Sequence, residues 1–362
     1  MGKLFNIKSK ISNYEVIKTS TTIEKLLLSN KYSLCLVDDF YKSQIKMVDY
    51  SKIIFIKANE NSKQLAKILP ILTKIANKKL SRSDKMLVVG GGVLQDIGTL
   101  VASIYRRGIN WDYAPTTVLA MVDSCIGGKS SINLGKYKNQ IGNYWPPKKI
   151  LLNSKFAETQ KKIDLLSGLS EGYKITYVSS KRDFNKFIEN CESFYKTLNF
   201  KHLQSLLEIS LYSKKRIIES DEFDDGKRLF LNFGHSFGHS IESITKYSIS
   251  HGFAVAIGCI MEIIFAENYY KIKMDSYTKR LINSLLFLTY KMTKHQKKLL
   301  KKISVRQLFE ILSYDKKIYN GLLKLPVAST AGRFTLKKID FKKDKAKKNF
   351  FVSYQELSNL IR

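Results

Sequence analysis

The sequence has little of what would direct a chain into a membrane or out of the cell. No run of about 18 apolar residues occurs, whereas a membrane-spanning helix needs about 20. No charged segment followed by an apolar one begins the chain, so we expect neither secretion nor membrane insertion. Cysteine is scarce, and the four thiols stand far apart, mostly in apolar runs. We therefore expect buried, reduced cysteines in a cytoplasmic protein.

Acidic residues are few relative to basic ones. The chain has 31 Asp and Glu against 62 Lys and Arg, a formal net charge of +31. Clustered cations attract phosphate backbones, yet here lysine is spread along the whole length. The densest basic run, residues 337–348, carries no recognisable nucleic-acid-binding motif. We interpret the charge as a solvated basic surface and predict no nucleic-acid partner.

The overall composition is ordinary for a globular protein, and 362 residues allow two domains. Up to about residue 150, short strand-like runs alternate with helical ones, which is typical of an α/β domain with a largely parallel sheet. The clearest strands are 33–39, 52–58 and 85–92. From about 155 the pattern is helical, with few strand signals until near 326. We predict an α/β domain over 1–155 and a mostly α-helical domain over 156–362.

The third predicted strand ends in the glycine turn 90–92, and a helical stretch, 93–108, follows. A glycine turn between strand and helix lets backbone amides and the helix N-terminus face a phosphate group. The spacing is not the G-x-G-x-x-G of the standard dinucleotide fingerprint. The next segment, 114–142, gathers hydroxyls, one carboxylate, a second glycine pair and three lysines. Such a mixture is common in sites that hold polyanions.

Three of the five histidines lie in one stretch, 228–252. His235 and His239 are four apart in a helix-compatible run, so they project from one helix face, one turn apart. His251 begins an apolar run that is typical of a buried helix. Imidazole is a common transition-metal ligand, and a catalytic site typically takes three protein ligands. This stretch alone predicts that all three histidines bind one metal ion; the alternative is that hydrogen bonds satisfy them and no metal binds.

The stretch 228–242 with His251-Gly252 resembles the C-terminal signature of 3-dehydroquinate synthase and the related sugar-phosphate cyclases. Other motifs match that family in order and spacing over roughly residues 33 to 325. They are GGG-x-x-x-D at 90–96, Arg107-Gly108, the segments 115–117, 121–124 and 127–129, Lys138-Asn139-x-x-Gly142 and the pair Glu60-x-x-Lys63. The resemblance implies a Rossmann-like, dinucleotide-binding α/β N-terminal domain followed by a mostly α-helical, metal-binding C-terminal domain.

The resemblance also implies NAD as a cofactor. Asp38 and Asp39 both match the family's strand-end acid at the NAD ribose; the sequence does not separate them, and we carry Asp39 forward. The implied contacts of the pyrophosphate and nicotinamide side are Gly91, Gly92 and Asp96. Those of the rest of the cofactor are Glu60, Lys63, Thr116, Thr117, Lys138, Phe156 and Thr159. The residues implied where cofactor and substrate meet are Asp123, Lys129 and Asn139.

One further motif changes the ligand set. Glu171 and Lys174 share a face of a predicted helix, and an isolated pair of this kind is normally a surface ion pair. They resemble, however, the family's Ala-Glu-x-x-Lys element, whose glutamate is a metal ligand and whose lysine contacts substrate hydroxyls. The resemblance therefore implies that Glu171, His235 and His251 bind one zinc or cobalt ion. It assigns His239 to the substrate phosphate instead of to the metal ion.

Other polar side chains are implied around the substrate. Lys214 and Arg228 would hold its carboxylate, and such a charge-assisted contact fixes which end of the molecule faces the metal. Asn232 is implied for the phosphate and the hydroxyls, and the motif 315–317, Asp-Lys-Lys, for the phosphate. Arg107 would cross a dimer interface, which makes a homodimer the expectation.

The implied reaction converts 3-deoxy-arabino-heptulosonate 7-phosphate to 3-dehydroquinate in the shikimate pathway, with phosphate released and NAD regenerated. Three alternatives stay open. A sister cyclase acting on another phosphosugar, in secondary or surface-polysaccharide metabolism, need not keep the carboxylate contact. An NAD- and metal-dependent alcohol dehydrogenase would not need so many anion contacts. A nucleic-acid-binding or inactive relative would have no reason to retain three metal ligands.

The chain departs from the family pattern at several positions. Gln95 stands where the family usually has glycine, and its side chain must point away from the pyrophosphate or crowd it. Phe253 replaces the acid after His-Gly, Gly172-Tyr173 replaces two aliphatic residues, and 175–184 lacks the usual form. None of these changes removes an implied ligand or anion contact. We expect them to tune the site or its specificity.

Overall fold

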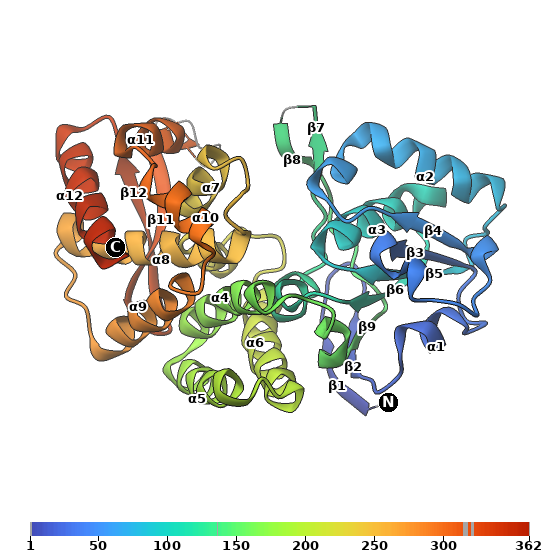
Figure 1. Ribbon diagram of the computed structural model, residues 1–362. Coiled ribbons are helices and arrows are strands. Elements are labelled where there is room, and N and C mark those ends of the chain that lie inside the picture. Colours follow the sequence, from blue (N-terminus) through green and yellow to red (C-terminus); the bar gives the residue numbers. More distant parts are fainter. Residues whose placement is uncertain (1, 136, 314–317, 320–321, 362) are drawn as a thin grey trace. The chain divides into compact units, whose positions relative to one another are not determined.

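A computed structural model describes residues 2–135, 137–313, 318–319 and 322–361 (Figure 1). The chain divides into two compact units, Met1–Gln160 and Lys161–Arg362. Unit 1 is an α/β unit and unit 2 is mostly helical, so the predicted fold class is confirmed. The motif 315–317, which is implied to contact phosphate, lies outside the described residues.

The main sheet of unit 1 has seven strands. In chain order they are β1 (Gly2–Ile7), β2 (Tyr14–Lys18), β3 (Leu34–Asp38), β4 (Ile53–Ile56), β5 (Lys85–Gly90), β6 (Asn110–Pro115) and β9 (Lys149–Leu152). Their spatial order is β1-β2-β9-β6-β5-β3-β4, and every neighbouring pair is parallel except β1 with β2. The three strands predicted from the sequence are β3, β4 and β5.

Helices, short helical turns and one β-hairpin connect these strands. They are α1 (Ile23–Leu27), η1 (Asp39–Ser43), η2 (Tyr50–Lys52), η3 (Glu60–Lys63), α2 (Leu65–Asn77), α3 (Gly92–Ile104), η4 (Tyr105–Arg107), the π-helical turn η5 (Ala120–Ser124), the hairpin β7 (Ile132–Leu134) with β8 (Tyr137–Ile141), and η6 (Ser154–Ala157). The helix predicted at 93–108 ends earlier, at Ile104, because Arg106 and Arg107 take left-handed φ angles of 49° and 61°.

The strand order of unit 1 creates a topological switch point at the edge of the sheet where the carboxyl ends of the strands lie. β3 pairs with β4 on one side and with β5 on the other, so the chain leaves the carboxyl end of β3 in one direction and that of β5 in the opposite one. Ligands of open α/β sheets bind at such a switch point. Asp38 ends β3 and Gly90 ends β5, which brings the predicted acid and the glycine turn to this edge.

Unit 2 combines helices with a small antiparallel sheet. Its helices are α4 (Lys162–Ser179), α5 (Lys181–Thr197), α6 (Phe200–Ser220), the 3-10 turn η7 (Lys227–Asn232), α7 (His235–Ile244), α8 (His251–Tyr270), α9 (Ser276–Thr289), α10 (Lys294–Lys301), α11 (Val305–Ser313) and α12 (Asp344–Leu360). Its strands are β10 (Ile318–Tyr319), β11 (Leu322–Thr330) and β12 (Arg333–Asp340), in that spatial order. The strand signal expected near 326 is β11.

Helix α8 forms the core of unit 2. It is long and apolar enough to cross a membrane, but 83% of its apolar window is buried inside the protein, which is the condition of a core helix. Its glycines allow backbone contact with its neighbours. A Cβ atom on Gly252 would lie 1.8 Å from the carbonyl oxygen of Ser167 in α4, and one on Gly258 would lie 2.0 Å from that of Gly234 before α7. These contacts fix the start of α8 against α4, and the start of α7 against the middle of α8.

The four cysteines are free and buried, two in each unit. This confirms the prediction of buried thiols without disulfides.

Candidate functional site

One acidic and two histidine side chains meet in unit 2. Glu171 lies in the middle of α4, and His235 and His251 are the first residues of α7 and α8. The Oε1 atom of Glu171 is 3.5 Å from Nε2 of His235 and 3.4 Å from Nε2 of His251. One ligand atom from each of the three residues lies within 4.8 Å of the others. This spacing suits ligands that share one metal ion.

The surroundings of Glu171 favour a bound cation. Its side chain is fully buried, and neither carboxylate oxygen accepts a hydrogen bond from the described residues. Lys174, one turn further along α4, forms an ion pair with Oε2. A buried carboxylate is costly unless cations and donors surround it, so Oε1, which faces the two histidines, is well suited to a metal ion.

A second carboxylate supports His251 from its other side. Both oxygens of Glu242 lie 3.3 Å from Nδ1 of His251, while Nε2 faces Glu171. Burial lowers the pKa of His251, but Glu171 and Glu242 outweigh it and raise that pKa to about 10. A carboxylate at one ring nitrogen commonly orients a histidine whose other nitrogen binds a metal.

His239 lies beside this group and is exposed. It is on the same face of α7 as His235, one turn on, with ring centroids 5.2 Å apart. Its ring centroid is 6.0 Å from that of His251. His239, Glu242 and His251 form a second set whose ligand atoms lie within 4.8 Å of one another. The structure therefore gathers all three histidines, and Glu171 faces two of them.

The cations implied for the substrate are buried in unit 2. Lys174, Lys214 and Arg228 have 1%, 5% and 3% of their surface exposed, and such burial is rare for these residue types. The guanidinium of Arg228 donates to the Glu222 carbonyl, a contact that orients it. Asn232, the last residue of η7, is half-buried.

In unit 1, five predicted residues form one polar network. Nζ of Lys63 lies 2.8 Å from Oδ2 of Asp96 and donates to Oδ1 of Asn139 at 3.0 Å. Glu60 Oε1 lies 3.4 Å from Nζ of Lys138 and 3.8 Å from Nζ of Lys63. Burial raises the pKa of Asp96 to about 6, although Lys63 opposes this shift. The network joins η3, α3 and β8.

Asn133 links this network, and the motifs did not single it out. Its Nδ2 donates to Oε1 of Glu60 at 2.8 Å, and its Oδ1 accepts from the backbone N–H of Asn139 at 2.9 Å. That contact holds Asn139 in a left-handed conformation, φ 53°. A small polar residue close after the second glycine pair was the only sequence signal.

The glycine turn is tightly packed at Gly91 and open at Gly92, the first residue of α3. A Cβ atom on Gly91 would lie 2.9 Å from Cγ2 of Thr117, so a larger residue would not fit there. A Cβ on Gly92 would meet only Oγ of Ser124, at 3.7 Å. The side chain of Gln95 is held by Ser124: Nε2 donates to its carbonyl at 2.6 Å and Oε1 accepts from its hydroxyl at 2.7 Å. These two hydrogen bonds hold the side chain of Gln95 against η5.

A hollow of about 340 Å³ opens in unit 1, and Phe156 and Thr159 line it. Tyr41, which the motifs did not identify, lines it as well and donates to the Phe156 carbonyl at 3.5 Å. At the end of β3, Asp38 accepts from the backbone N–H of Phe40 at 3.1 Å and caps η1, whereas Asp39 is exposed. The adjacent aspartates thus differ in local role.

The remaining predicted residues of unit 1 lie on turns and strand ends. Thr116 donates its backbone N–H to the Gly90 carbonyl at 3.0 Å. Asp123 is in η5, Lys129 has its Nζ 5.9 Å from the ring centroid of Tyr144, and Arg107 is exposed. These positions are compatible with ligand contacts.

Solved structures with a similar fold include 2-epi-5-epi-valiolone synthase from Streptomyces hygroscopicus subsp. jinggangensis with NAD+ and Zn2+ bound. It matches with a TM-score of 0.78 at 20% identity, over 97% of this chain and 98% of that one. A 2-deoxy-scyllo-inosose synthase complexed with carbaglucose-6-phosphate, NAD+ and Co2+ matches with a TM-score of 0.77 at 19% identity, over 96% and 98% of the two chains.

Sequence comparison is more specific. The profile described as 3-dehydroquinate synthase N-terminal matches residues 53–167, and that described as 3-dehydroquinate synthase C-terminal matches 168–318. The 3-dehydroquinate synthase of Campylobacter jejuni subsp. doylei is 34% identical over 301 residues, 82% of this chain and 83% of that protein. That of Buchnera aphidicola subsp. Cinara cedri is 40% identical over 249 residues, 68% and 65% of the two chains. The chain thus belongs to the 3-dehydroquinate synthase family.

Proposed function

We propose that this chain converts 3-deoxy-arabino-heptulosonate 7-phosphate to 3-dehydroquinate and releases phosphate, with NAD and one divalent metal ion as cofactors. The observation that carries the proposal is the group of Glu171, His235 and His251 in a member of this family. We further propose that the enzyme acts in the shikimate pathway in the cytoplasm, as a homodimer with Arg107 crossing the interface.

Glu171, His235 and His251 would hold the metal ion. One carboxylate and two imidazoles form a donor set that zinc and cobalt accept, and they leave a coordination position open. Oε1 of Glu171, which faces the two histidines and accepts no hydrogen bond from the described residues, supports this assignment. When bound, the ion supplies a Lewis acid for a substrate oxygen, and NAD supplies a reversible hydride acceptor.

The residues of unit 1 would bind NAD. The pyrophosphate would rest on the N–H groups at the start of α3, around Gly91 and Gly92, where the helix dipole favours negative charge. Asp39 is proposed for the ribose, since Asp38 already caps η1. The other proposed contacts are Glu60, Lys63, Asp96, Thr116, Thr117, Asp123, Lys129, Lys138, Phe156 and Thr159.

The buried cations of unit 2 would orient the substrate. Lys214 and Arg228 would bind its carboxylate and Lys174 its hydroxyls. His239 and Asn232 would contact the phosphate, and Lys129 and Asn139 would complete the contacts. Fixed cations replace the solvation that these anionic groups lose on binding. The chain's main contribution is then to position a substrate with two anionic groups and to neutralise its charge.

Phosphate release from a panel of phosphosugars, with NAD far below the substrate concentration, tests the proposal. We expect many turnovers per NAD with the heptulosonate phosphate and little release from sugars without a carboxylate. Faster release from a neutral-headed phosphosugar would favour a sister cyclase. Stoichiometric formation of NADH would favour a dehydrogenase.

A further inference from the structure

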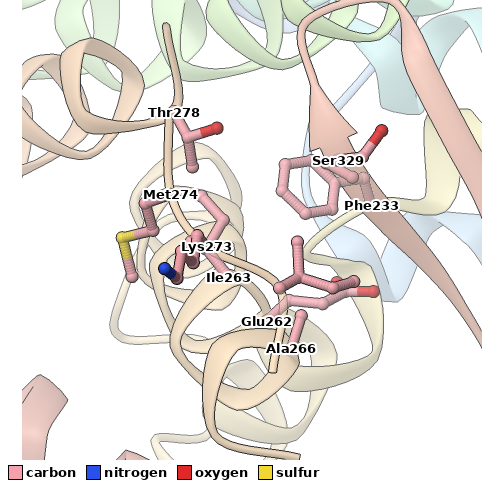
Figure 2. A pocket seen from close by; sticks show the side chains of 10 residues that line it. Phe233, Glu262, Ile263, Ala266, Lys273, Met274, Thr278 and Ser329 are labelled. Carbon is pink, nitrogen blue, oxygen red and sulfur yellow. The ribbon is translucent and has the colours of Figure 1, made fainter. Parts of the chain in front are cut away.

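A third carboxylate lies behind the histidine group. Glu262 is in the middle of α8, with 1% of its surface exposed. It lines a small internal pocket of unit 2 together with Phe233 and Thr278 (Figure 2). The pocket offers about 10 Å³, which is room for about one water molecule, so it is too small for a substrate. Because burying a carboxylate is costly, its presence calls for a specific reason.

Glu262 contacts the backbone just before α7. Its Oε2 accepts a hydrogen bond from the N–H of Gly234. Gly234 caps α7 in a left-handed conformation, φ 77°, and no side chain of α7's own N-terminus provides a cap. A negative charge near a helix N-terminus is favourable. A cap alone would, however, need only a neutral acceptor.

The peptide group between Phe233 and Gly234 connects Glu262 to His235. Its N–H donates to Glu262, and its carbonyl oxygen lies 3.3 Å from Nδ1 of His235. The thiol of Cys259 donates to the same carbonyl at 3.6 Å. If Nε2 of His235 binds a metal, Nδ1 carries the proton and donates to this carbonyl. A carboxylate on the N–H side polarises the peptide and makes its carbonyl a stronger acceptor.

We infer that Glu262 is a positioning residue for the metal site, which acts on His235 through the Phe233–Gly234 peptide. The inference rests on the proposed function, since it requires a metal ion at His235. A carboxylate would then support the Nδ1 atom of each histidine ligand, directly in one case and indirectly in the other. Glu242 contacts Nδ1 of His251 directly, and Glu262 reaches Nδ1 of His235 through one peptide group. Outer carboxylates of this kind typically contribute about 10- to 100-fold to metal affinity.

The test compares Glu262→Gln with Glu267→Gln. Both substitutions remove one negative charge from α8, but Glu267 lies five residues beyond Glu262 and does not line the pocket. The dissociation constant for Co²⁺ is measured by competition with a chromophoric chelator, and the cobalt d–d spectrum is recorded. We expect Glu262→Gln to bind Co²⁺ about tenfold more weakly with an altered d–d spectrum, although glutamine can still accept from Gly234. Glu267→Gln should match the wild type.

Equal cobalt affinity and equal spectra for the two variants would overturn the inference. If Glu262→Gln fails to fold, an NMR measurement on the wild-type protein tests the inference instead. The sequence has two Phe-Gly pairs, 233–234 and 237–238, so ¹³C-Phe/¹⁵N-Gly labelling selects these two amides. Gly238 makes an ordinary helical bond to the Gly234 carbonyl. We expect the Gly234 proton to resonate further downfield and to move again on zinc binding.

A Gly234 amide that matches Gly238 with zinc bound would remove the role of Glu262 and leave the proposed function standing. Wild-type protein that binds neither Co²⁺ nor Zn²⁺ would overturn the metal site, and this inference with it.

Discussion

The predicted site residues of the two units are held in different ways. In unit 1 they lie on turns, strand ends and a hairpin, and a polar network ties them together through Lys63, Asp96 and Asn139. In unit 2 the proposed metal-site residues belong to three helices whose backbones touch at Gly252 and Gly258. Side-chain networks can exchange partners when a ligand arrives, whereas close-packed backbones cannot.

This comparison suggests that unit 2 holds its histidines and its acid in place before any ligand binds. In unit 1, by contrast, the charged side chains already form ion pairs and hydrogen bonds with one another. Substitutions should therefore act differently in the two units: steric changes should matter most in unit 2, and charge changes in unit 1 should act mainly on the cofactor.

The largest effect is expected from an added methyl group at the α4–α8 contact. Gly252→Ala places Cβ 1.8 Å from the Ser167 carbonyl, so α8 must move and carry His251 away from Glu171. We expect a loss of at least about 3 kcal/mol in stability, together with weaker cobalt binding. Thermal unfolding and cobalt titration measure both.

The matched control is Gly92→Ala in unit 1, where the nearest atom to the new Cβ is 3.7 Å away. It should leave thermal unfolding and cobalt binding nearly unchanged and weaken NAD binding. Equal destabilisation by the two substitutions would remove the contrast between the units.

The second effect concerns the buried cations. Arg228→Ala should lower kcat/KM for the heptulosonate phosphate by about thirtyfold or more, since loss of a charge-assisted contact in a desolvated site costs about 2–5 kcal/mol. Cobalt and NAD affinities should stay the same, because Arg228 is not proposed to contact either cofactor. Arg182→Ala, at an exposed position of α5, is the control. Unchanged kinetics for both variants would mean that Arg228 does not bind the substrate.

The third effect tests whether unit 1 acts on NAD alone. Asp96→Ala removes one partner of Lys63, and we expect NAD to bind about tenfold more weakly, since a hydrogen bond to a charged group contributes about 1.5–3 kcal/mol. Isothermal calorimetry should give an unchanged cobalt affinity. A parallel loss of cobalt affinity would show that the two sites do not behave independently.

The smallest effect is a pH dependence. Because the pKa of Asp96 is raised to about 6, above its unfolded value near 3.9, its contribution to stability is complete at low pH and declines as pH rises through the folded pKa. Between pH 5 and 7 the wild type should lose about 1 kcal/mol relative to Asp96→Asn. Urea unfolding at both pH values checks this. An equal pH response of the two proteins would show that Asp96 has an ordinary pKa.

The sequence predicted the elements whose signals are local. Strands β3, β4 and β5 and the helices with Glu171, His235 and His251 follow from short apolar patterns and helical spacing. The roles proposed for Glu171 and His239 needed the family resemblance, because an isolated Glu-x-x-Lys pair or His-x-x-x-His pair has several structural explanations.

The features that escaped prediction depend on contacts between distant parts of the chain. Asn133 contacts Glu60, 73 residues away, and Tyr41 contacts Phe156, 115 residues away. Whether Gln95 would block the glycine turn depended on Ser124, 29 residues further on. In the sequence, Glu262 is only one polar residue in an apolar helix. Its hydrogen bond with the backbone N–H of Gly234 becomes visible only in the structure. No local pattern encodes these partners.

The position of the metal ion tests the account most directly, because two sets of ligand atoms compete for it and share His251. Anomalous diffraction at the zinc edge from zinc-loaded crystals locates the ion. We predict one peak about 2.0–2.2 Å from Glu171 and from Nε2 of His235 and His251, with Glu242 on Nδ1 of His251. A peak bound instead by His239, Glu242 and His251 would contradict the account.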